Sequence, residues 1–290
     1  MKAAMRPAYT VELVTPRKVQ LNGLWLGPAK AKRVVIWVHG LGSSMFSKLG
    51  IADALVDKET AVLAFNNRGH GKVMYASRGA KSLRVGSAHE IFTDCADDIE
   101  GAIRFAKAAG AREIFLAGHS TGCQKSVYWA AKGRGVKGII LLAPISDYAA
   151  ELTMSTRAAI TKGLAHARAL VKSGRGNQLM PESLRPWPLL TDAQRYVSLF
   201  SGDSLEEIFT YWAPERTPVA LRKVRVPILV LLAEKDEYRD RPPRKMADWF
   251  TEHLNRTNRV AVVPKVGHSF KGAERVVAQH MHSFMKAIKQ

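Results

Sequence analysis

A serine stands between two glycines at the end of an apolar run, in the stretch IFLAGHSTGC (114–123). Gly118 precedes Ser120 by two positions and Gly122 follows it by two. A sharp turn from a strand into a helix would hold the serine in a strained conformation with its hydroxyl clear of the sheet. Side chains at the two flanking positions would then collide with neighbouring backbone. A serine that only capped a helix would need neither glycine, so the pattern predicts a nucleophile at Ser120.

A serine hydroxyl is a weak nucleophile, so a catalytic serine needs a base that takes its proton and an acid that orients the base. His268 ends the last apolar run, in KVGHSF. If that run is a strand, His268 lies at the carboxyl edge of a sheet, where the turn with Ser120 would also lie. His268 is therefore the predicted base. The following histidines are interpreted as structural or surface residues: His39, His70, His119, His280 and His282.

Six apolar runs alternate with amphipathic stretches in the rhythm of βαβ units. They lie at 33–40, 61–69, 113–120, 137–144, 227–236 and 259–268. Such continuous apolar runs are typical of a parallel sheet that is buried on both faces. Apolar residues at helical spacing predict helices within 88–109, 243–254 and 272–289. Alternation in residues 9–27 predicts an antiparallel hairpin at one edge. The fold class is therefore α/β, with a mostly parallel central sheet and helices on both faces.

Residues 146–222 interrupt this rhythm, because they are far longer than an ordinary connection between two strands. Capping-box spacing occurs at Thr191 with Gln194 and at Ser204 with Glu207, and apolar residues from 205 to 212 form a helical stripe. Residues 173–188 are rich in glycine and proline and predict an irregular portion. We interpret 146–222 as an inserted helical lid. Residues 1–145 and 223–290 then form the core.

The turn around Ser120, followed by an acidic segment and then by His268, resembles the nucleophile elbow and residue order of the serine α/β-hydrolases. The resemblance covers nearly the whole chain and is to lid-bearing, esterase-like and lipase-like members. NNRGHG (66–71) resembles a strand-end turn of the same proteins, in which the arginine, here Arg68, is structural. GHSTGCQ resembles the elbow of siderophore-ester hydrolases of the fusarinine C esterase group, where an acidic residue is expected at the position of Lys125.

The resemblance implies the remaining site residues. In similar hydrolases the acid lies two to three residues beyond a small residue that ends a strand. Ala233 is such a residue in LLAEKDEYRD, which favours Asp236 and leaves Glu234 as the alternative. The oxyanion hole of this family uses the N–H of the residue after the nucleophile, here Thr121. It takes a second N–H from a loop such as HGLGSS (39–44), which indicates Leu41.

Composition limits the class of protein. The chain has 290 residues, of which 47% are hydrophobic, enough to bury a sizeable core. Cys95 and Cys123 are too few for a disulfide framework, and we expect both to be reduced, small apolar residues in helices. The start does not resemble a signal peptide, and no run reaches the ~18 apolar residues of a membrane span. We expect a cytoplasmic protein without a transmembrane segment.

The net charge of +19 is the extreme feature of the composition. Basic residues are scattered over the chain, without zinc-finger spacing or a basic recognition helix, so specific nucleic-acid binding is not expected. The charge would instead keep the protein soluble and steer anionic substrates toward it. The densest cluster lies between Arg68 and Arg84 and is the part that could still contact a ligand.

We therefore predict a serine hydrolase that cleaves carboxylic esters. Ser120, His268 and Asp236 would form a Ser-His-Asp triad, an acyl-enzyme would be the intermediate, and neither a metal nor an organic cofactor would be needed. The expected partner is a small-molecule ester. A thioesterase, a peptidase, a lyase or a carbon-carbon bond hydrolase could use the same fold and residues. A non-catalytic ligand-binding protein that kept the fold is a further alternative.

Overall fold

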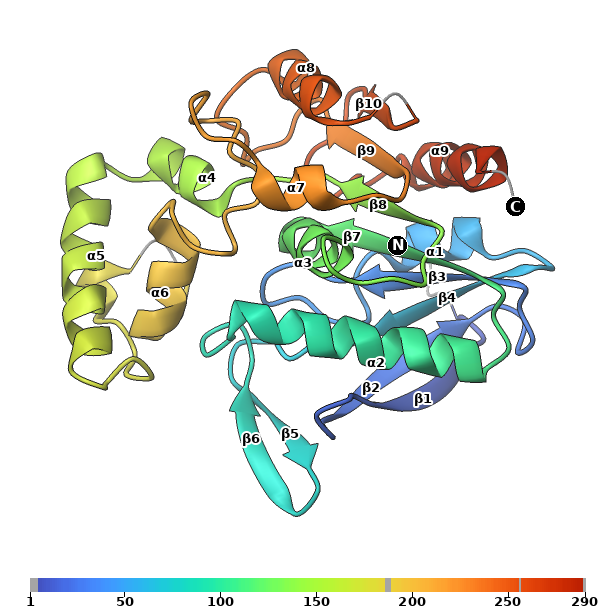
Figure 1. Cartoon of the computed structure of the whole chain (residues 1–290), viewed down its shortest axis with the longest axis horizontal. Coiled ribbons are helices and arrows are strands. Elements are labelled where there is room, and N and C mark those ends of the chain that lie inside the picture. Colours follow the sequence, from blue (N-terminus) through green and yellow to red (C-terminus); the bar gives the residue numbers. More distant parts are fainter. Residues whose placement is uncertain (1–4, 186–188, 256, 289–290) are drawn as a thin grey trace.

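An eight-stranded sheet forms the centre of the structure, a computed structural model that describes residues 5–185, 189–255 and 257–288 (Figure 1). The strands lie in the order β1-β2-β4-β3-β7-β8-β9-β10. All neighbours pair in parallel except β1 with β2 and β2 with β4, which are antiparallel. Their bounds are β1 Tyr9–Val14, β2 Gln20–Leu26, β3 Arg33–Val38, β4 Thr60–Phe65, β7 Glu113–His119, β8 Gly138–Leu142, β9 Ile228–Ala233 and β10 Arg259–Val263.

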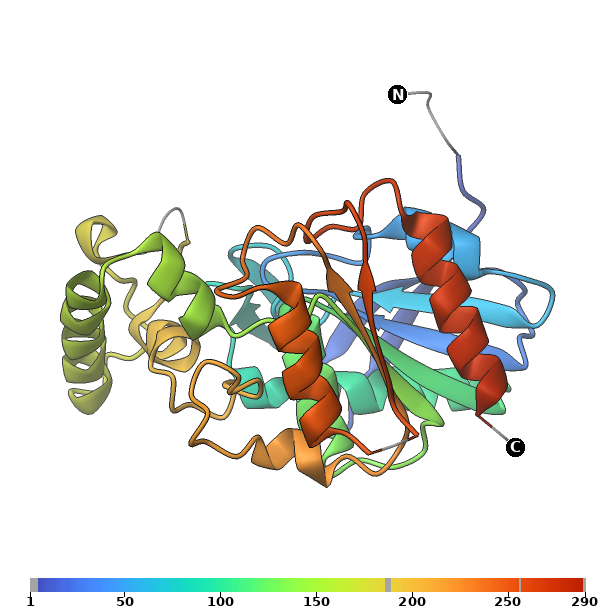
Figure 2. The same ribbon diagram turned by 90° about the horizontal axis from the view of Figure 1, so that it is seen from above.

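Helices cover both faces of this sheet (Figure 2). On one face, α2 (Cys95–Ala108), α3 (Thr121–Ala130) and α8 (Pro243–His253) contribute side chains to one apolar cluster. On the other face, α1 (Leu49–Leu55) and α9 (Glu274–Ala287) contribute to a second cluster. Every residue of β4, β7, β8 and β9 is buried, because these strands are enclosed from both sides. The α/β fold class and the N-terminal hairpin are confirmed.

The helix predicted from residue 88 begins later than expected. The short 3₁₀ turn Phe92–Asp94 leads into α2, which begins at Cys95. Residues 86–88 donate their amides to backbone carbonyls of residues 68–72 instead of forming helical hydrogen bonds. The start of the predicted helix therefore closes a loop against an earlier segment. Both cysteines are buried, free and helical, as expected.

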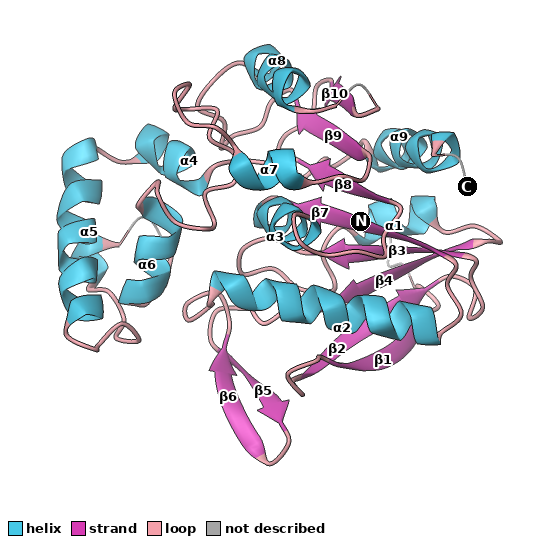
Figure 3. Cartoon of the chain, viewed as in Figure 1, coloured by secondary structure: helices cyan, strands magenta, loops and turns pink. Residues whose placement is uncertain are grey.

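A second, two-stranded sheet escaped the sequence analysis (Figure 3). Strands β5 (Met74–Arg78) and β6 (Lys81–Val85) pair antiparallel within the basic cluster of residues 68–84. They join through Gly79, whose φ of 59° suits a tight hairpin turn. Short strands with few apolar residues carry a weak sequence signal, so this hairpin was not expected.

Residues 146–222 contain α4 (Asp147–Met154), α5 (Arg157–Lys172) and α6 (Ala193–Phe200), and α7 (Val219–Lys223) leads back to the sheet. Figures 1 and 2 show α4, α5 and α6 set apart from the sheet, beyond the carboxyl ends of its strands. Their apolar residues form a small core of their own. Ser146, Thr156 and Asp192 cap the three helices through their side-chain oxygens. That the segment acts as a lid stays a prediction.

Two details of this segment correct the sequence analysis. The helix predicted from the apolar stripe at 205–212 is wrong, because these residues form turns and extended chain. Ile208, Phe209 and Tyr211 are all buried in the main core, and the Phe209 ring packs on Phe250 of α8 at 5.5 Å between ring centres. An irregular segment can bury successive side chains on different sides, whereas a helix would bury only one face. The cap of α6 is Asp192 and not Thr191. Of the glycine-rich and proline-rich stretch, residues 186–188 lie outside the described residues.

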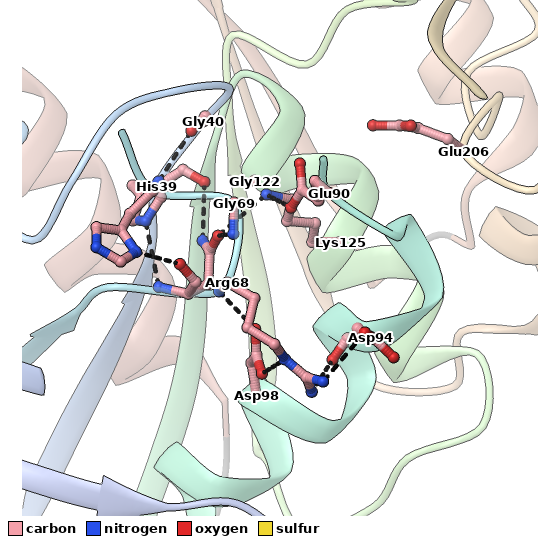
Figure 4. A network of polar contacts seen from close by, with 12 residues as sticks. His39, Gly40, Arg68, Gly69, Glu90, Asp94, Asp98, Gly122, Lys125 and Glu206 are labelled. Carbon is pink, nitrogen blue, oxygen red and sulfur yellow. Dashed lines mark hydrogen bonds and ion pairs between the residues drawn. The ribbon is translucent and has the colours of Figure 1, made fainter. Parts of the chain in front are cut away.

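A chain of buried charges joins α6 to the sheet domain. Lys125 of α3 has no exposed surface, and its Nζ lies 2.5 Å from Glu90 Oε1 (Figure 4). The other Glu90 oxygen lies 2.9 Å from the guanidinium of Arg195 in α6, which is also fully buried. Arg195 in turn pairs with Glu206. Burial alone would raise the pKa of Glu90, but Lys125 and Arg195 lower it below its usual value.

Removing one member of this chain should destabilise the protein, because it leaves a buried charge without its partner. We expect Lys125→Met to lower the free energy of unfolding by about 3 kcal/mol, measured by urea denaturation. Lys125→Met combined with Glu90→Gln should recover part of the loss, since Arg195 then remains paired with Glu206. A single variant as stable as the native protein would show that the ion pair contributes little.

Candidate active site

Ser120 occupies a strained turn between β7 and α3. Its φ of 56° and ψ of −129° lie outside the regions that side-chain-bearing residues usually adopt. A Cβ atom at Gly118 would overlap the Gly122 carbonyl group, and one at Gly122 would overlap the Val38 carbonyl oxygen. The Ser120 amide donates to the Leu142 carbonyl at 3.0 Å, which fixes the turn against β8. The two glycines thus provide the space that the sequence pattern indicated.

His268 and Asp236 contact each other on neighbouring loops at the carboxyl ends of β10 and β9. His268 Nδ1 lies 2.8 Å from Asp236 Oδ2, and both side chains are buried. The other Asp236 oxygen accepts the Tyr238 amide at 3.0 Å, so the carboxylate is held in place. With Asp236 ionised and the ring neutral, Nδ1 donates this hydrogen bond. Nε2 is then left able to accept a proton.

The neighbouring carboxylates contact backbone amides. Glu234 Oε2 accepts from the Lys265 amide at 2.6 Å, and Glu237 Oε2 accepts from the His268 amide at 2.9 Å. Of the two acids considered from the sequence, Asp236 is therefore the one that meets the imidazole. Glu237 thus holds the backbone of the histidine loop. Spacing in the sequence does not distinguish a carboxylate that contacts the imidazole ring from one that contacts a backbone amide.

His119 ties the turn with Ser120 to the loop with His268. Its Nε2 lies 2.8 Å from the His268 carbonyl oxygen, and the two rings are 4.9 Å apart between centres. Burial, with a further contribution from His268, lowers the pKa of His119 well below its usual value. The neutral ring can therefore donate from Nε2 to the carbonyl. The structural interpretation of His119 agrees with this contact, which brings the two loops together.

The loop after β3 lies directly against the nucleophile. A Cβ atom at Gly40 would stand 2.9 Å from Ser120 Cβ, so the backbone approaches closely. Next to it, Leu41 packs on the apolar cluster of the helical segment 146–222. On the other side of Ser120, Thr121 is the first residue of α3, and an N–H at this position has no partner inside the helix. Of the two predicted oxyanion donors, Thr121 directly follows Ser120 in the chain, and Leu41 follows Gly40, whose backbone approaches Ser120.

Buried imidazole and guanidinium groups hold the loops under this site (Figure 4). His39 Nδ1 lies 2.8 Å from the Gly40 carbonyl oxygen, and its Nε2 accepts the Asn67 amide at 3.2 Å. Burial lowers the pKa of His39 to about 3, so the ring stays neutral. Arg68 bonds Asp98 at 2.6 Å, and burial raises the pKa of that carboxyl to about 6 despite the guanidinium. These contacts agree with the structural interpretation of Arg68.

Two further acidic groups lie on the segment 146–222, and the sequence analysis assigned neither of them to the site. Asp147 of α4 accepts a hydrogen bond from Gln124 Nε2 at 2.8 Å, and Gln124 lies one helical turn after Ser120. Glu207 accepts from the Trp212 indole at 3.1 Å. Burial, reinforced by Glu206, raises the pKa of Asp147 to about 8, and burial raises that of Glu207 to about 7. The segment facing α3 therefore holds carboxyl groups that take up protons near neutral pH.

The raised pKa of Asp147 should make stability depend on pH. The folded protein keeps this proton above pH 3.8, where the unfolded chain loses it, so stability falls as the pH rises toward about 8. In Asp147→Asn, we expect the fall in unfolding free energy from pH 5 to pH 8 to shrink by on the order of 2 kcal/mol. Urea denaturation at several pH values measures it. Asp203→Asn removes an exposed carboxylate and should change nothing; equal effects would contradict the assignment.

In the described part of the chain, no group of three or more histidine, cysteine, aspartate or glutamate residues is arranged to hold a metal ion. In the glycine-rich loop 39–44, Gly40 lies directly against Ser120 and the His119 carbonyl oxygen.

Comparisons with known protein families and solved structures agree with the fold described above. The family model described as "Serine aminopeptidase, S33" matches residues 29–272. No curated protein sequence matches the chain. The siderophore hydrolase EstB from Aspergillus fumigatus is similar in structure, with a TM-score of 0.71, 15% identity, and coverage of 99% of this chain and 98% of that one. An esterase of Pyrococcus furiosus has a TM-score of 0.62, 16% identity and coverage of 98% and 92%. At these identities the structures show a shared fold.

Proposed function

We propose, from the premise that the chain belongs to the serine aminopeptidase S33 family of α/β-hydrolases, that it cleaves carboxylic esters with Ser120, His268 and Asp236 as its triad. The observation that carries this proposal is the contact of 2.8 Å between His268 Nδ1 and Asp236. This contact engages Nδ1, so Nε2 is the ring nitrogen that would act as the base, on a loop that His119 joins to the strained serine turn. A base oriented in this way is what a serine nucleophile requires.

In the proposed reaction, His268 Nε2 takes the Ser120 proton as Oγ attacks the substrate carbonyl carbon. The carbonyl oxygen becomes an oxyanion, which accepts hydrogen bonds from the Leu41 and Thr121 amides. His268 then gives its proton to the leaving alkoxide, and the acyl-enzyme remains. Water, deprotonated by the same imidazole, attacks the acyl carbon and releases the acid and Ser120. Asp236 stays ionised and holds the ring in position.

The preference for esters is supported by what similar proteins do. The structural neighbours named above are an esterase and a siderophore hydrolase, although their identity to this chain is low. Leu41 and Tyr148 both pack on the apolar cluster of the segment 146–222, and Tyr148 contacts Trp212 at 4.7 Å between ring centres. These apolar side chains beside the oxyanion loop suit the acyl part of an ester.

A second candidate is an aminopeptidase, which the description of the family also names. The observation that favours it is the pair of buried carboxyl groups, Asp147 and Glu207, on the segment that faces α3. The ammonium group at the start of a peptide would be a charge partner for them, and it would lower their raised pKa values. Aminoacyl nitroanilides and nitrophenyl esters of matched acyl size separate the two candidates.

Ser120→Ala should leave the protein folded and lower kcat for nitrophenyl esters by about 10⁴ to 10⁶, because nothing else can form the acyl-enzyme. A fluorophosphonate probe should label the native protein and not the variant. Circular dichroism provides the control for folding. A variant that keeps a tenth of the activity would overturn the mechanism. A native protein that the probe does not label would indicate a non-catalytic member of the fold.

Asp236→Asn should lower kcat by about 10⁴, since an asparagine amide disfavours the imidazole tautomer that accepts the serine proton. Glu234→Gln is the matched control, because it changes a nearby carboxylate that contacts a backbone amide. We expect it to change kcat less than tenfold. Steady-state kinetics of both variants measure the ranking, and the reverse order would move the role of the acid to Glu234.

A further inference from the structure

The β5–β6 hairpin projects from the sheet domain (Figures 1 and 3). Residues 69–89 contain no aspartate or glutamate. Four exposed cations lie on the hairpin or at its base, and none of them forms an ion pair within the described residues. They are Lys72, Arg78, Lys81 and Arg84. Elsewhere in the same region, Arg68 is satisfied by three aspartates, so the free charge belongs to the hairpin.

Large apolar side chains are exposed beside these cations. Val73 is 39% exposed, Met74 40% and Tyr75 68%, and the three residues are consecutive. Tyr75 stands opposite Arg84 in the ladder, so the two side chains lie on the same face of the hairpin. Ala76 and Leu83 lie on the other face and pack on the core. The outward face therefore combines an aromatic ring with positive charge.

We propose that this hairpin is a docking element for an anionic lipid surface. Lysine and arginine are attracted to negatively charged headgroups, and tyrosine with aliphatic neighbours enters the boundary between headgroups and acyl chains. Charge alone would suit a nucleic acid equally, but exposed valine and methionine gain nothing from contact with a phosphate backbone. In the part of the chain that the structure describes, no helix is long and apolar enough to cross a membrane, so this contact would be peripheral.

The base of the hairpin joins the loop that carries Leu41. The Gly71 amide donates to the Ser43 carbonyl oxygen at 3.0 Å, and the Ser87 amide donates to the Gly71 carbonyl oxygen at 3.0 Å. The first hydrogen bond attaches the hairpin to the loop after β3, and the second closes the base of the hairpin. The docking proposal does not rest on the proposed ester hydrolysis, and it is tested by binding alone.

The chain offers a matched control with equal charge. Lys132, Arg134, Lys223 and Arg225 line a hollow of about 200 Å³ between the end of α3 and the segment after α7. All four are exposed. The tryptophan of this hollow, Trp129, is only 4% exposed, so the hollow presents charge without an exposed aromatic ring. Neutralising either set of four cations removes the same net charge from the protein.

The test is sedimentation with vesicles of phosphatidylcholine, with and without phosphatidylglycerol. We expect the native protein to bind the anionic vesicles, and Lys72, Arg78, Lys81 and Arg84 together changed to Gln to lower the partition coefficient by more than about 100-fold. Tyr75→Ser combined with Val73→Ser, which keeps the charge, should lower it about tenfold. The control set changed to Gln should lower it less than tenfold. Thermal denaturation followed by circular dichroism confirms that each variant is folded.

Three outcomes would overturn the proposal. Equal losses in the two sets of charge variants would show that binding follows net charge and not the hairpin. Unchanged binding in Tyr75→Ser with Val73→Ser would show that the apolar residues do not enter the bilayer. Native protein that ignores the vesicles but binds duplex DNA through the hairpin cations would assign the surface to a nucleic acid.

Discussion

The crowded backbone around Ser120 is the constraint on which the candidate site depends. At Gly40, Gly118 and Gly122 the chain comes so close to its neighbours that a side chain could not fit without a shift. Strands β3 and β7 can therefore meet the start of α3 directly, and the serine is forced into a conformation that other residues rarely adopt. The strain is offset by packing on all sides, since β7 is buried along its whole length and β3 is buried except at Arg33. The geometry of the candidate site is thus a consequence of how closely three segments of backbone approach.

Buried charge is the second organising feature, and for Arg68, Glu90 and Arg195 the pairing outweighs the cost of burial. Arg68 is surrounded by three aspartates, and although burial opposes its charge, they raise its pKa above the usual value. Lys125, Glu90 and Arg195 extend the same principle from the sheet domain into the helical segment 146–222. His89 adds a contact of 2.8 Å with Asp192, the cap of α6. These ion pairs orient the helical segment against the serine turn. The apolar core of the segment, in contrast, holds only its own helices together.

The net charge of this protein does not describe the groups beside the serine turn. The net charge is +19, yet Asp147 contacts Gln124 of α3, and burial raises the pKa of this carboxyl to about 8 and that of Glu207 to about 7. The surface field would attract anions toward the protein, but these acidic groups would favour a neutral or cationic moiety close to the serine. The free positive charge on the β5–β6 hairpin lies outside this region. The net charge therefore governs how anions approach the protein, and it does not describe what the site itself recognises.

The sequence by itself determined the features that depend on local pattern. Continuous apolar runs specified the buried strands, and the paired glycines specified the turn at Ser120. The resemblance to similar hydrolases, through the spacing after Ala233, favoured Asp236 and left Glu234 as the alternative. Only the tertiary structure decided that Asp236 contacts the His268 ring and that Glu237 contacts the His268 amide. It also explains how Lys125 can occupy a position where an acid was expected, because Glu90 pairs with it. It also decided that residues 205–212 form no helix and that a hairpin rises from the basic cluster. The physical reason is that hydrogen bonds and ion pairs depend on atoms brought together from distant segments, such as Glu90 with Arg195, whereas periodicity records only the face that each residue buries.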